Sequence, residues 1–256
     1  MTRDFGRHVY GAAAVFFGLL TLYWRHDVNP WQQFQALATT PYREPINDLV
    51  ATFAIAGGIA IQRQAWARLG ALLLGALYLF CALSCLPGIV QAPRVYNSWG
   101  NFFEQFSMFS GAIIVYASVA AGRLTGTIAT AEIGRAFFGI CVLSFTLEQA
   151  FYLHATAGLV PKWIPPGQTF WAVATTIAFG LAAIAILSGR LALLASRLLT
   201  AMLLLFGILL WLPTLFVTPP NHFDWSENAE NLAIAGVAWI LADHLQGARR
   251  VGVRRG

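Results

Sequence analysis

The sequence contains a succession of apolar runs, each long enough to cross a lipid bilayer. A transmembrane helix needs about 20 mostly apolar residues. The spans that we predict are 9–26, 46–63, 67–87, 101–122, 134–157, 168–188, 190–213 and 228–246. Several of these runs have no polar face, and a bilayer is the environment that suits such a helix on all sides. We therefore expect an all-α membrane protein of about eight transmembrane helices.

The composition agrees with a membrane protein and excludes other classes. Of the 256 residues, 58% are hydrophobic and 11% are charged, against roughly a quarter charged in soluble domains. The net charge of +5 does not indicate nucleic acid, because the arginines are scattered over loops. The expected partners are therefore membrane lipids. The three cysteines (Cys81, Cys85 and Cys141) lie in apolar stretches, where they are interpreted as packing residues.

The second span is the weakest of the eight, because Gly57-Gly58 and Gln62 shorten its apolar run. The segment 27–45 before it contains Pro30, Pro41 and Pro45. Proline removes a backbone donor and interrupts helices. We expect this segment to be a loop outside the membrane or a partly re-entrant one.

The distribution of basic residues predicts the orientation. Cytoplasmic loops of membrane proteins carry an excess of Lys and Arg. With the N-terminus inside, twelve basic residues fall on the inner side: Arg3, Arg7, Arg63, Arg68, Arg123, Arg135, Arg190, Arg197, Arg249, Arg250, Arg254 and Arg255. The outer side then carries four: Arg25, Arg43, Arg94 and Lys162. We therefore predict a protein of a bacterial-type inner membrane with both termini in the cytoplasm.

The two halves of the chain resemble each other. Pro87 matches Pro213 at a separation of 126 residues (213 − 87), and the same separation pairs Pro93 with Pro219, Trp99 with Trp225, Glu104 with Glu230 and Gln105 with Asn231. Near the start of each half, Arg7, Gly11 and His26 match Arg135, Gly139 and His154 at a separation of 128 (154 − 26). Such residue types are rare in apolar sequence, so these matches indicate an internal repeat.

The repeat predicts two four-helix units: residues 1–126, a degenerate copy, and residues 127–256, which end in a basic cytoplasmic tail. Because four spans is an even number, both copies insert with the same orientation. In a parallel duplication of this kind, a pseudo-two-fold axis along the membrane normal relates the two copies.

The first candidate site lies where each half resumes a helix on the outer side. Glu104 and Glu230 follow Trp99 and Trp225, and the amides Gln105, Asn228 and Asn231 lie beside them. A carboxylate early in a helix is favoured by the helix dipole, so capping and anchoring is one interpretation. The alternative is a pair of symmetry-related carboxylates that face a shared, outward-opening cavity.

Glu148 is the second candidate. It lies 13 residues after Arg135, or roughly 20 Å along a helix, beyond the midplane but still within hydrocarbon. An ionised carboxylate there is costly, so the side chain is expected to be protonated, paired or facing a cavity. Glu148 is the candidate catalytic residue, as a proton carrier. The alternative is a hydrogen bond between helices from a neutral carboxyl group.

His26 and His154 form the third candidate, as residues at equal depth near the outer ends of the first and fifth spans. Facing histidines can ligate a b-type haem. No further histidine pair at a matching depth supports this, so haem is not expected. The alternative is that the two histidines form hydrogen bonds at the membrane interface. A further interpretation is that His154 binds a quinone headgroup. No metal-binding motif is present.

The stretch from Arg135 to about Asp243 resembles the DoxX-like membrane protein family. The resemblance rests on Gly139, His154, the Val160–Pro165 turn, the basic turn Arg190–Arg197 and Leu212-Pro213. It implies a four-helix unit. Some members of that family are subunits of a thiosulfate:quinone oxidoreductase, and others are linked to thiol-redox complexes. No catalytic residues carry over from the family.

We therefore expect an accessory or small-molecule-binding subunit of a membrane redox system. The first alternative is a quinone-interacting oxidoreductase subunit. The second alternative is a small-solute permease that uses Glu104, Glu148 and Glu230. A permease needs polar residues that continue to the inner side, and the sequence has very few below Glu148.

Overall fold

Helices follow one another throughout the part of the chain that the computed structural model describes, which comprises residues 4–26, 41–120, 127–216 and 220–253. The first half contains α1 (Phe5–Tyr23), α2 (Arg43–Ala60), α3 (Ala67–Ser84), α4 (Leu86–Gln91) and α5 (Tyr96–Ala120). The second half contains α6 (Thr127–Phe151), α7 (Leu153–Leu159), α8 (Gln168–Ser188), α9 (Ala192–Phe206), a π-helical turn (Gly207–Trp211), α10 (Leu212–Thr214) and α11 (His222–Val253). This confirms the all-α prediction for the described residues.

Six helices in the described part are long and apolar enough to cross a membrane: Phe5–Tyr23, Ala67–Gln91, Tyr96–Ala120, Ala129–Phe151, Gln168–Ser188 and Ala192–Thr214. The protein is therefore a multi-pass membrane protein. The other two predicted spans correspond to α2 and α11. These helices are more polar: α2 carries Arg43, Glu44 and Asp48 within its 18 residues, and α11 begins with a polar segment, His222–Asn231.

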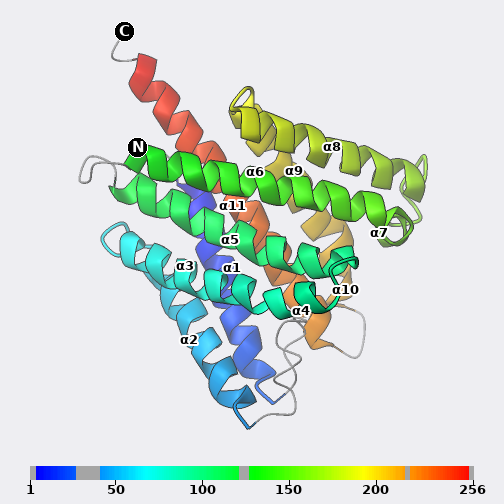
Figure 1. Ribbon diagram of the computed structural model, residues 1–256, viewed down its shortest axis with the longest axis horizontal. Coiled ribbons are helices and arrows are strands. Elements are labelled where there is room, and N and C mark those ends of the chain that lie inside the picture. The colour runs from blue at the N-terminus through cyan, green and yellow to red at the C-terminus, as the bar shows by residue number, and fades with distance from the viewer. Residues whose placement is uncertain (1–3, 27–40, 121–126, 217–219, 254–256) are drawn as a thin grey trace.

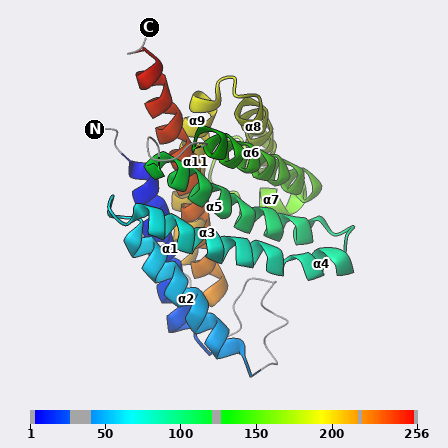
Figure 2. The same ribbon diagram turned by 60° about the vertical axis from the view of Figure 1, so that its left-hand side comes forward.

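The helices diverge from one end of the molecule. In Figure 1 the start of α1 and the last turns of α11 lie on the same side of the molecule, where α11 projects beyond α1, and Figure 2 shows α1, α2 and α11 running steeply across α3 and α5. Helix α1 packs against α2 and α11, while α5 packs against α3, α6 and α11. In the second half, α8 packs against α6 and α9, and α9 packs against α11. Helix α11 therefore connects the two halves.

Small residues allow the central helices to approach closely. A Cβ atom on Gly58 of α2 would stand 2.6 Å from the carbonyl oxygen of Gly11 on α1, and one on Gly236 of α11 would stand 2.7 Å from the backbone nitrogen of Tyr10. Interfaces between membrane helices are enriched in such residues, because backbone contact adds van der Waals attraction. Gly58, which weakens the second apolar run in the sequence, is therefore a packing contact.

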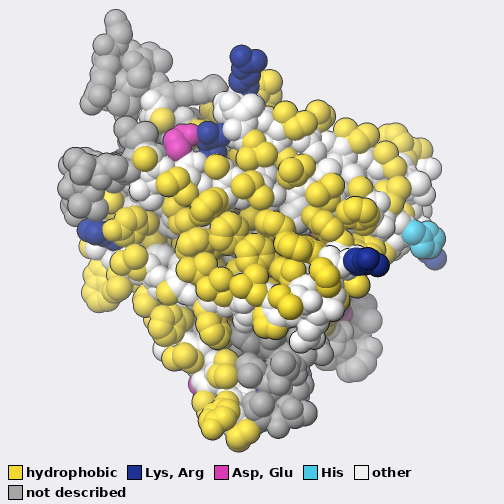
Figure 3. Space-filling model, viewed as in Figure 1, with side chains coloured by type: hydrophobic (Ala, Val, Ile, Leu, Met, Phe, Trp, Pro, Cys, Tyr) yellow, Lys and Arg dark blue, Asp and Glu magenta, His cyan; other side chains and the backbone are white. Residues whose placement is uncertain are grey.

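The outside of the bundle is apolar. Figure 3 shows hydrophobic side chains covering most of one face, with few charged groups. Large exposed side chains on the outer helices include Leu72, Phe80, Ile140, Ile177, Leu181, Ile184, Leu198 and Ile208. An apolar surface of this extent suits lipid tails.

Helix boundaries differ from the prediction at several places. Helix α2 begins at Arg43, so the end of the predicted 27–45 loop is helical; residues 27–40 lie outside the described part. The predicted span 134–157 is interrupted at Tyr152, whose backbone is not helical, and continues as α7. Pro87 and Pro213 each lie in the first turn of a short helix (α4 and α10), where proline costs no hydrogen bond.

Other sequence predictions lie outside the described residues. They concern Arg3, Arg123, Pro219, Arg254 and Arg255, together with the side chains of Arg249 and Arg250.

Candidate functional site

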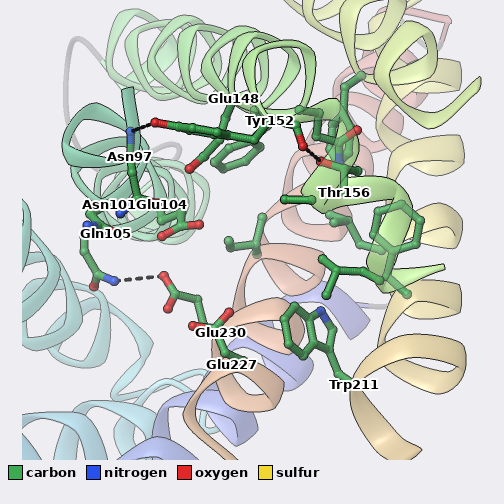
Figure 4. A pocket seen from close by; sticks show the side chains of 18 of the residues that line it. Asn97, Asn101, Glu104, Gln105, Glu148, Tyr152, Thr156, Trp211, Glu227 and Glu230 are labelled. Carbon is green, nitrogen blue, oxygen red and sulfur yellow. Dashed lines mark hydrogen bonds between the residues drawn. The ribbon is translucent and has the colours of Figure 1, made fainter. Parts of the chain in front are cut away.

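A cavity of about 630 Å³ lies where the start of α5, the end of α6 and the first turns of α11 meet. Its walls come from α5, α6, α7, α8, α9 and α11, with the π-helical turn on one side. It thus belongs mainly to the second half of the chain, and α5 of the first half closes it. Figure 4 shows the lining side chains converging on this space.

Helical periodicity explains the polar lining. Asn97, Asn101 and Glu104 line the cavity from α5. Their spacing of four and three residues places them on one face of that helix. On α11 the lining positions are Phe223, Glu227 and Glu230. These have the same spacing and lie 126 residues further along (227 − 101). The two helices therefore present equivalent positions to one cavity.

Helix α6 provides a third polar wall. Phe145, Glu148, Gln149 and Tyr152 line the cavity, again at helical spacing. Gln149 is held from behind, since its Oε1 accepts a hydrogen bond from Thr176 Oγ1 of α8 at 3.1 Å. The Tyr152 hydroxyl accepts a hydrogen bond from the backbone N–H of Asn97 at 3.2 Å. This contact joins the end of α6 to the start of α5.

Glu148 is placed by a glycine on the neighbouring helix. A Cβ atom on Gly100 of α5 would stand about 2.5 Å from the Cδ and Oε2 atoms of Glu148. A side chain larger than hydrogen at position 100 would therefore displace the carboxyl group. The close approach explains how a carboxyl group on α6 reaches the α5 wall of the cavity.

Gln105 links α5 to α11. Its Nε2 donates a hydrogen bond to Oε1 of Glu230 at 2.9 Å, and the side chain is only 2% exposed. In the described part of the chain, its Oε1 has no hydrogen-bond partner. The Gln105 amide therefore brings an acceptor and a bound carboxyl group to the inner part of the cavity (Figure 4).

The electrostatic character of the cavity is acidic. Among the residues that the structure describes, four carboxyl groups line it, those of Glu104, Glu148, Glu227 and Glu230, and no Lys, Arg or His does so. Electrostatic interaction connects Glu104 to both Glu148 and Glu227. No group of three or more His, Cys, Asp or Glu side chains in the described part is arranged to hold a metal ion. The carboxyl groups are thus distributed around the cavity.

The structure brings together four of the residues singled out from the sequence: Glu104, Gln105, Glu148 and Glu230 all line the cavity. Asn231 does not line it. Its Nδ2 donates to the carbonyl oxygen of Leu203 at 3.0 Å, behind the cavity wall. One residue along a helix is a rotation of about 100°, which turns Asn231 away from the face of Glu230.

The two histidines are not part of the cavity lining. His26 is exposed and pairs with Glu44 of α2, its Nδ1 lying 2.9 Å from Glu44 Oε1. His154 is exposed on α7. The end of α1 and α7 are well separated in Figures 1 and 2, so the two imidazoles do not face each other across a shared haem.

Glu227, Asn97, Asn101, Tyr152 and Trp211 line the cavity but were not singled out from the sequence. Glu227 had a detectable signal. It precedes Glu230 by three residues, which is one helical turn, and it matches the polar Asn101 in the repeat. Trp211 reaches the cavity from the π-helical turn, a feature that the sequence pattern does not indicate.

Comparison with other proteins finds no similarity: no protein family model matches the chain, and neither does any curated protein or solved structure. The roles of the lining residues therefore rest on their geometry.

Proposed function

We propose that this protein binds a small molecule within the membrane, in an outward-opening pocket of its second half. The observation that carries the proposal is the cavity of about 630 Å³ with polar groups from α5, α6 and α11 on aromatic walls. Ligand sites are concavities of roughly 300–1,000 Å³ with a few polar groups in a mainly apolar lining. The carboxyl groups of Glu104, Glu148, Glu227 and Glu230 have that arrangement here.

The proposal includes eight membrane crossings, with α2 and α11 added to the six apolar helices. Helix α2 is bound to α1 at both ends. At one end Arg25 Nη2 donates to Asp48 Oδ2 at 2.6 Å, and at the other end His8 Nδ1 lies 2.6 Å from Gln62 Oε1. Its 18 residues correspond to about 27 Å of helix. Helix α2 therefore returns along the full height of α1.

Helix α11 also runs alongside α1. At the inner end, the backbone N–H of Gly6 donates to Oδ2 of Asp243 at 3.0 Å. At the other end, Trp24 stacks on His222 with ring centroids 5.1 Å apart. These two contacts support a crossing from about residue 222 to residue 243. The polar face of α11 points into the protein, where lipid does not reach it.

A parallel duplication of four-helix units accounts for the order of these helices. Helix α1 packs on α11, and α6 packs on α5. This is the same contact if α1 corresponds to α6 and α5 to α11. Helix ends support that correspondence: α5 and α11 begin 126 residues apart (222 − 96), and α1 and α6 end 128 residues apart (151 − 23). These separations equal those of the paired residues in the sequence.

We place both termini in the cytoplasm and the protein in a bacterial-type inner membrane, on the distribution of basic residues. The cavity then opens on the outer side. Around the Gln105–Glu230 pair its inner lining is apolar, with Phe145, Phe179, Leu203 and Ile234. Below it, the hydroxyl groups of Ser196 and Thr200 donate to carbonyl groups of their own helix. This favours a binding site over a path for a permeating solute.

The family resemblance suggests that the protein serves as an accessory subunit of a membrane redox system. A quinone is the second candidate ligand, because Glu148 lies beside exposed apolar residues. Leu147 and Phe151, on either side of it, are 41% and 65% exposed, so a lipid-soluble headgroup has access to that edge. His154 does not line the cavity. For a bound quinone, the polar side chain beside Glu148 is therefore that of Tyr152.

The test is to identify small molecules that remain bound after purification in lipid nanodiscs, by native mass spectrometry and extraction. Ala155 lines the cavity from α7 and is exposed, so Ala155→Trp fills the opening without burying a polar group. Ala150→Trp, an exposed position outside the lining, is the matched control. We expect a molecule retained by the wild type and by the control but not by Ala155→Trp. Equal retention by all three, or no bound molecule in the wild type, would contradict the proposal.

A further inference from the structure

The charge of the cavity lining is unbalanced. Glu104 of α5, Glu148 of α6 and Glu227 of α11 approach the same space from three helices, and each interacts electrostatically with at least one of the others. No Lys, Arg or His side chain of the described ranges lines that space. Buried carboxyl groups are ordinarily protonated or have a cationic partner, because like charges repel strongly where water is scarce. Here the lining itself does not provide one.

The inner part of the cavity adds a second acceptor. Gln105 is 2% exposed, and its Nε2 is engaged by Glu230 at 2.9 Å. Its Oε1 has no hydrogen-bond partner in the described part of the chain. Buried amide oxygens are nearly always paired. This oxygen and the four carboxyl groups supply acceptors for a positively charged or hydrogen-donating ligand, beside the amide groups of Asn97, Asn101 and Gln149.

Aromatic rings form much of the remaining wall. They are Phe145, Tyr152, Phe179, Phe206, Trp211 and Phe223. The faces of aromatic rings attract cations, most strongly where water is excluded. They also provide apolar contact for a ring-sized ligand body. The two kinds of lining therefore match the two parts of an amphipathic cation.

We propose that the ligand of this cavity is an organic cation with an aromatic or similarly apolar body, held by Glu104, Glu148 and Glu227 and by the surrounding rings. The inference rests on the proposed function, because it names the ligand class of the same site. It excludes anions and disfavours neutral ligands. Binding supplies the positive charge that the lining lacks.

The experiment compares two probes of the same shape and opposite charge, tetraphenylphosphonium and tetraphenylborate. Their saturable binding to the protein in zwitterionic nanodiscs is measured by equilibrium dialysis, with empty nanodiscs as the blank. We expect one phosphonium per chain, bound at least about tenfold more tightly than the borate. Glu104→Gln, Glu148→Gln and Glu227→Gln each lower phosphonium affinity about tenfold. Glu44→Gln, outside the cavity, leaves it unchanged.

Two further outcomes separate the ligand class from the site. If the borate binds as tightly as the phosphonium and both are lost in Ala155→Trp but not in Ala150→Trp, the cavity is a binding site and the cation assignment is wrong. If neither probe binds, and native mass spectrometry finds no bound molecule either, both the cation assignment and the proposed function are wrong. Thermal unfolding of every variant, followed by circular dichroism, shows whether a loss of binding reflects a loss of fold.

Discussion

The carboxyl group of Glu148 on α6 lies directly against the backbone of Gly100 on α5. A methyl group at position 100 would stand about 2.5 Å from the Cδ atom of that carboxyl group, well inside van der Waals contact. This contact makes Gly100 part of the site although it has no side chain. It also allows the position of Glu148 to be tested without changing any charge.

Gly100→Ala is expected to displace Glu148 and to destabilise the protein by about 1–3 kcal/mol, the usual cost of an inserted methyl group. The matched control is Gly88→Ala on α4, where an added Cβ meets nothing within 4 Å. Unfolding free energies in mixed micelles provide the measurement. Glu148→Ala in the Gly100→Ala background removes the collision, so the two changes together should cost less than their sum. Strict additivity would show that the carboxyl group does not lie there.

The amides of α11 fix the π-helical turn that carries Trp211. Asn228 Nδ2 donates to the carbonyl oxygen of Trp211 at 2.8 Å, and Asn231 Nδ2 donates to that of Leu203 at 3.0 Å. Replacing either asparagine by leucine should cost about 1 kcal/mol of unfolding free energy, the usual net value of such a bond. Gln91→Leu, an exposed amide on α4, is the control. Equal stability of all three variants would mean that these bonds do not hold the turn.

The eight-crossing topology places the turn between α2 and α3 on the same side as the N-terminus. Gln64 lies in that turn, where its Oε1 accepts a hydrogen bond from Arg7 Nη1 at 2.5 Å. With Cys81, Cys85 and Cys141 replaced by alanine, a cysteine at position 64 should react with an impermeant thiol reagent from the cytoplasmic side only. A cysteine at Gln91 should react from the outside only. Labelling of position 64 from the outside and of position 91 from the cytoplasmic side would contradict this topology, because α3 still crosses between the two positions.

The contact between α1 and α2 at the outer side predicts a pH dependence. The pKa of Glu44 is lowered from its ordinary value of 4.5, chiefly by the hydrogen bond with His26 and further by the charges of Arg25 and Arg43. A lowered pKa in the folded state contributes stability above the ordinary pKa, and this is lost as the pH falls through the lowered value. The wild type should therefore lose more stability than Glu44→Gln between about pH 5 and 3. Parallel pH profiles would exclude this contribution.

The sequence predicted the six apolar helices of the described part, because their apolar runs match the thickness of a bilayer. It also identified Glu104, Gln105, Glu148 and Glu230, since a polar side chain within such a run has few roles other than facing the protein interior. The break at Tyr152 was not predicted. Nothing in the residue types around Tyr152 marks an interruption, and no proline follows until Pro161.

The histidines show where reasoning from depth fails. His26 and His154 were paired because they lie at equal depth in the two halves, but depth does not determine the direction of a side chain around the helix axis. His154 lies beyond the break at Tyr152, on the exposed side of α7. Glu227 was not singled out, since the repeat pairs Glu230 with Glu104 and both interpretations of the helix start rest on that pair. Its spacing from Glu230 and its match to Asn101 contained the missing information.

The central claim is that a cavity opens to the outer side between α5, α6 and α11, and its most direct test is the reactivity of a cysteine placed inside it. Asn101 lines the cavity from α5 and carries no charge. In a chain without its native cysteines, Asn101→Cys should react with an impermeant, positively charged thiosulfonate added outside intact cells, and Ala155→Trp should slow the reaction at least about tenfold. Leu147→Cys, on the apolar outer surface of α6, should stay unreactive. A cysteine at position 101 that is as unreactive as the one at 147, or that reacts only from the cytoplasmic side, would contradict the account.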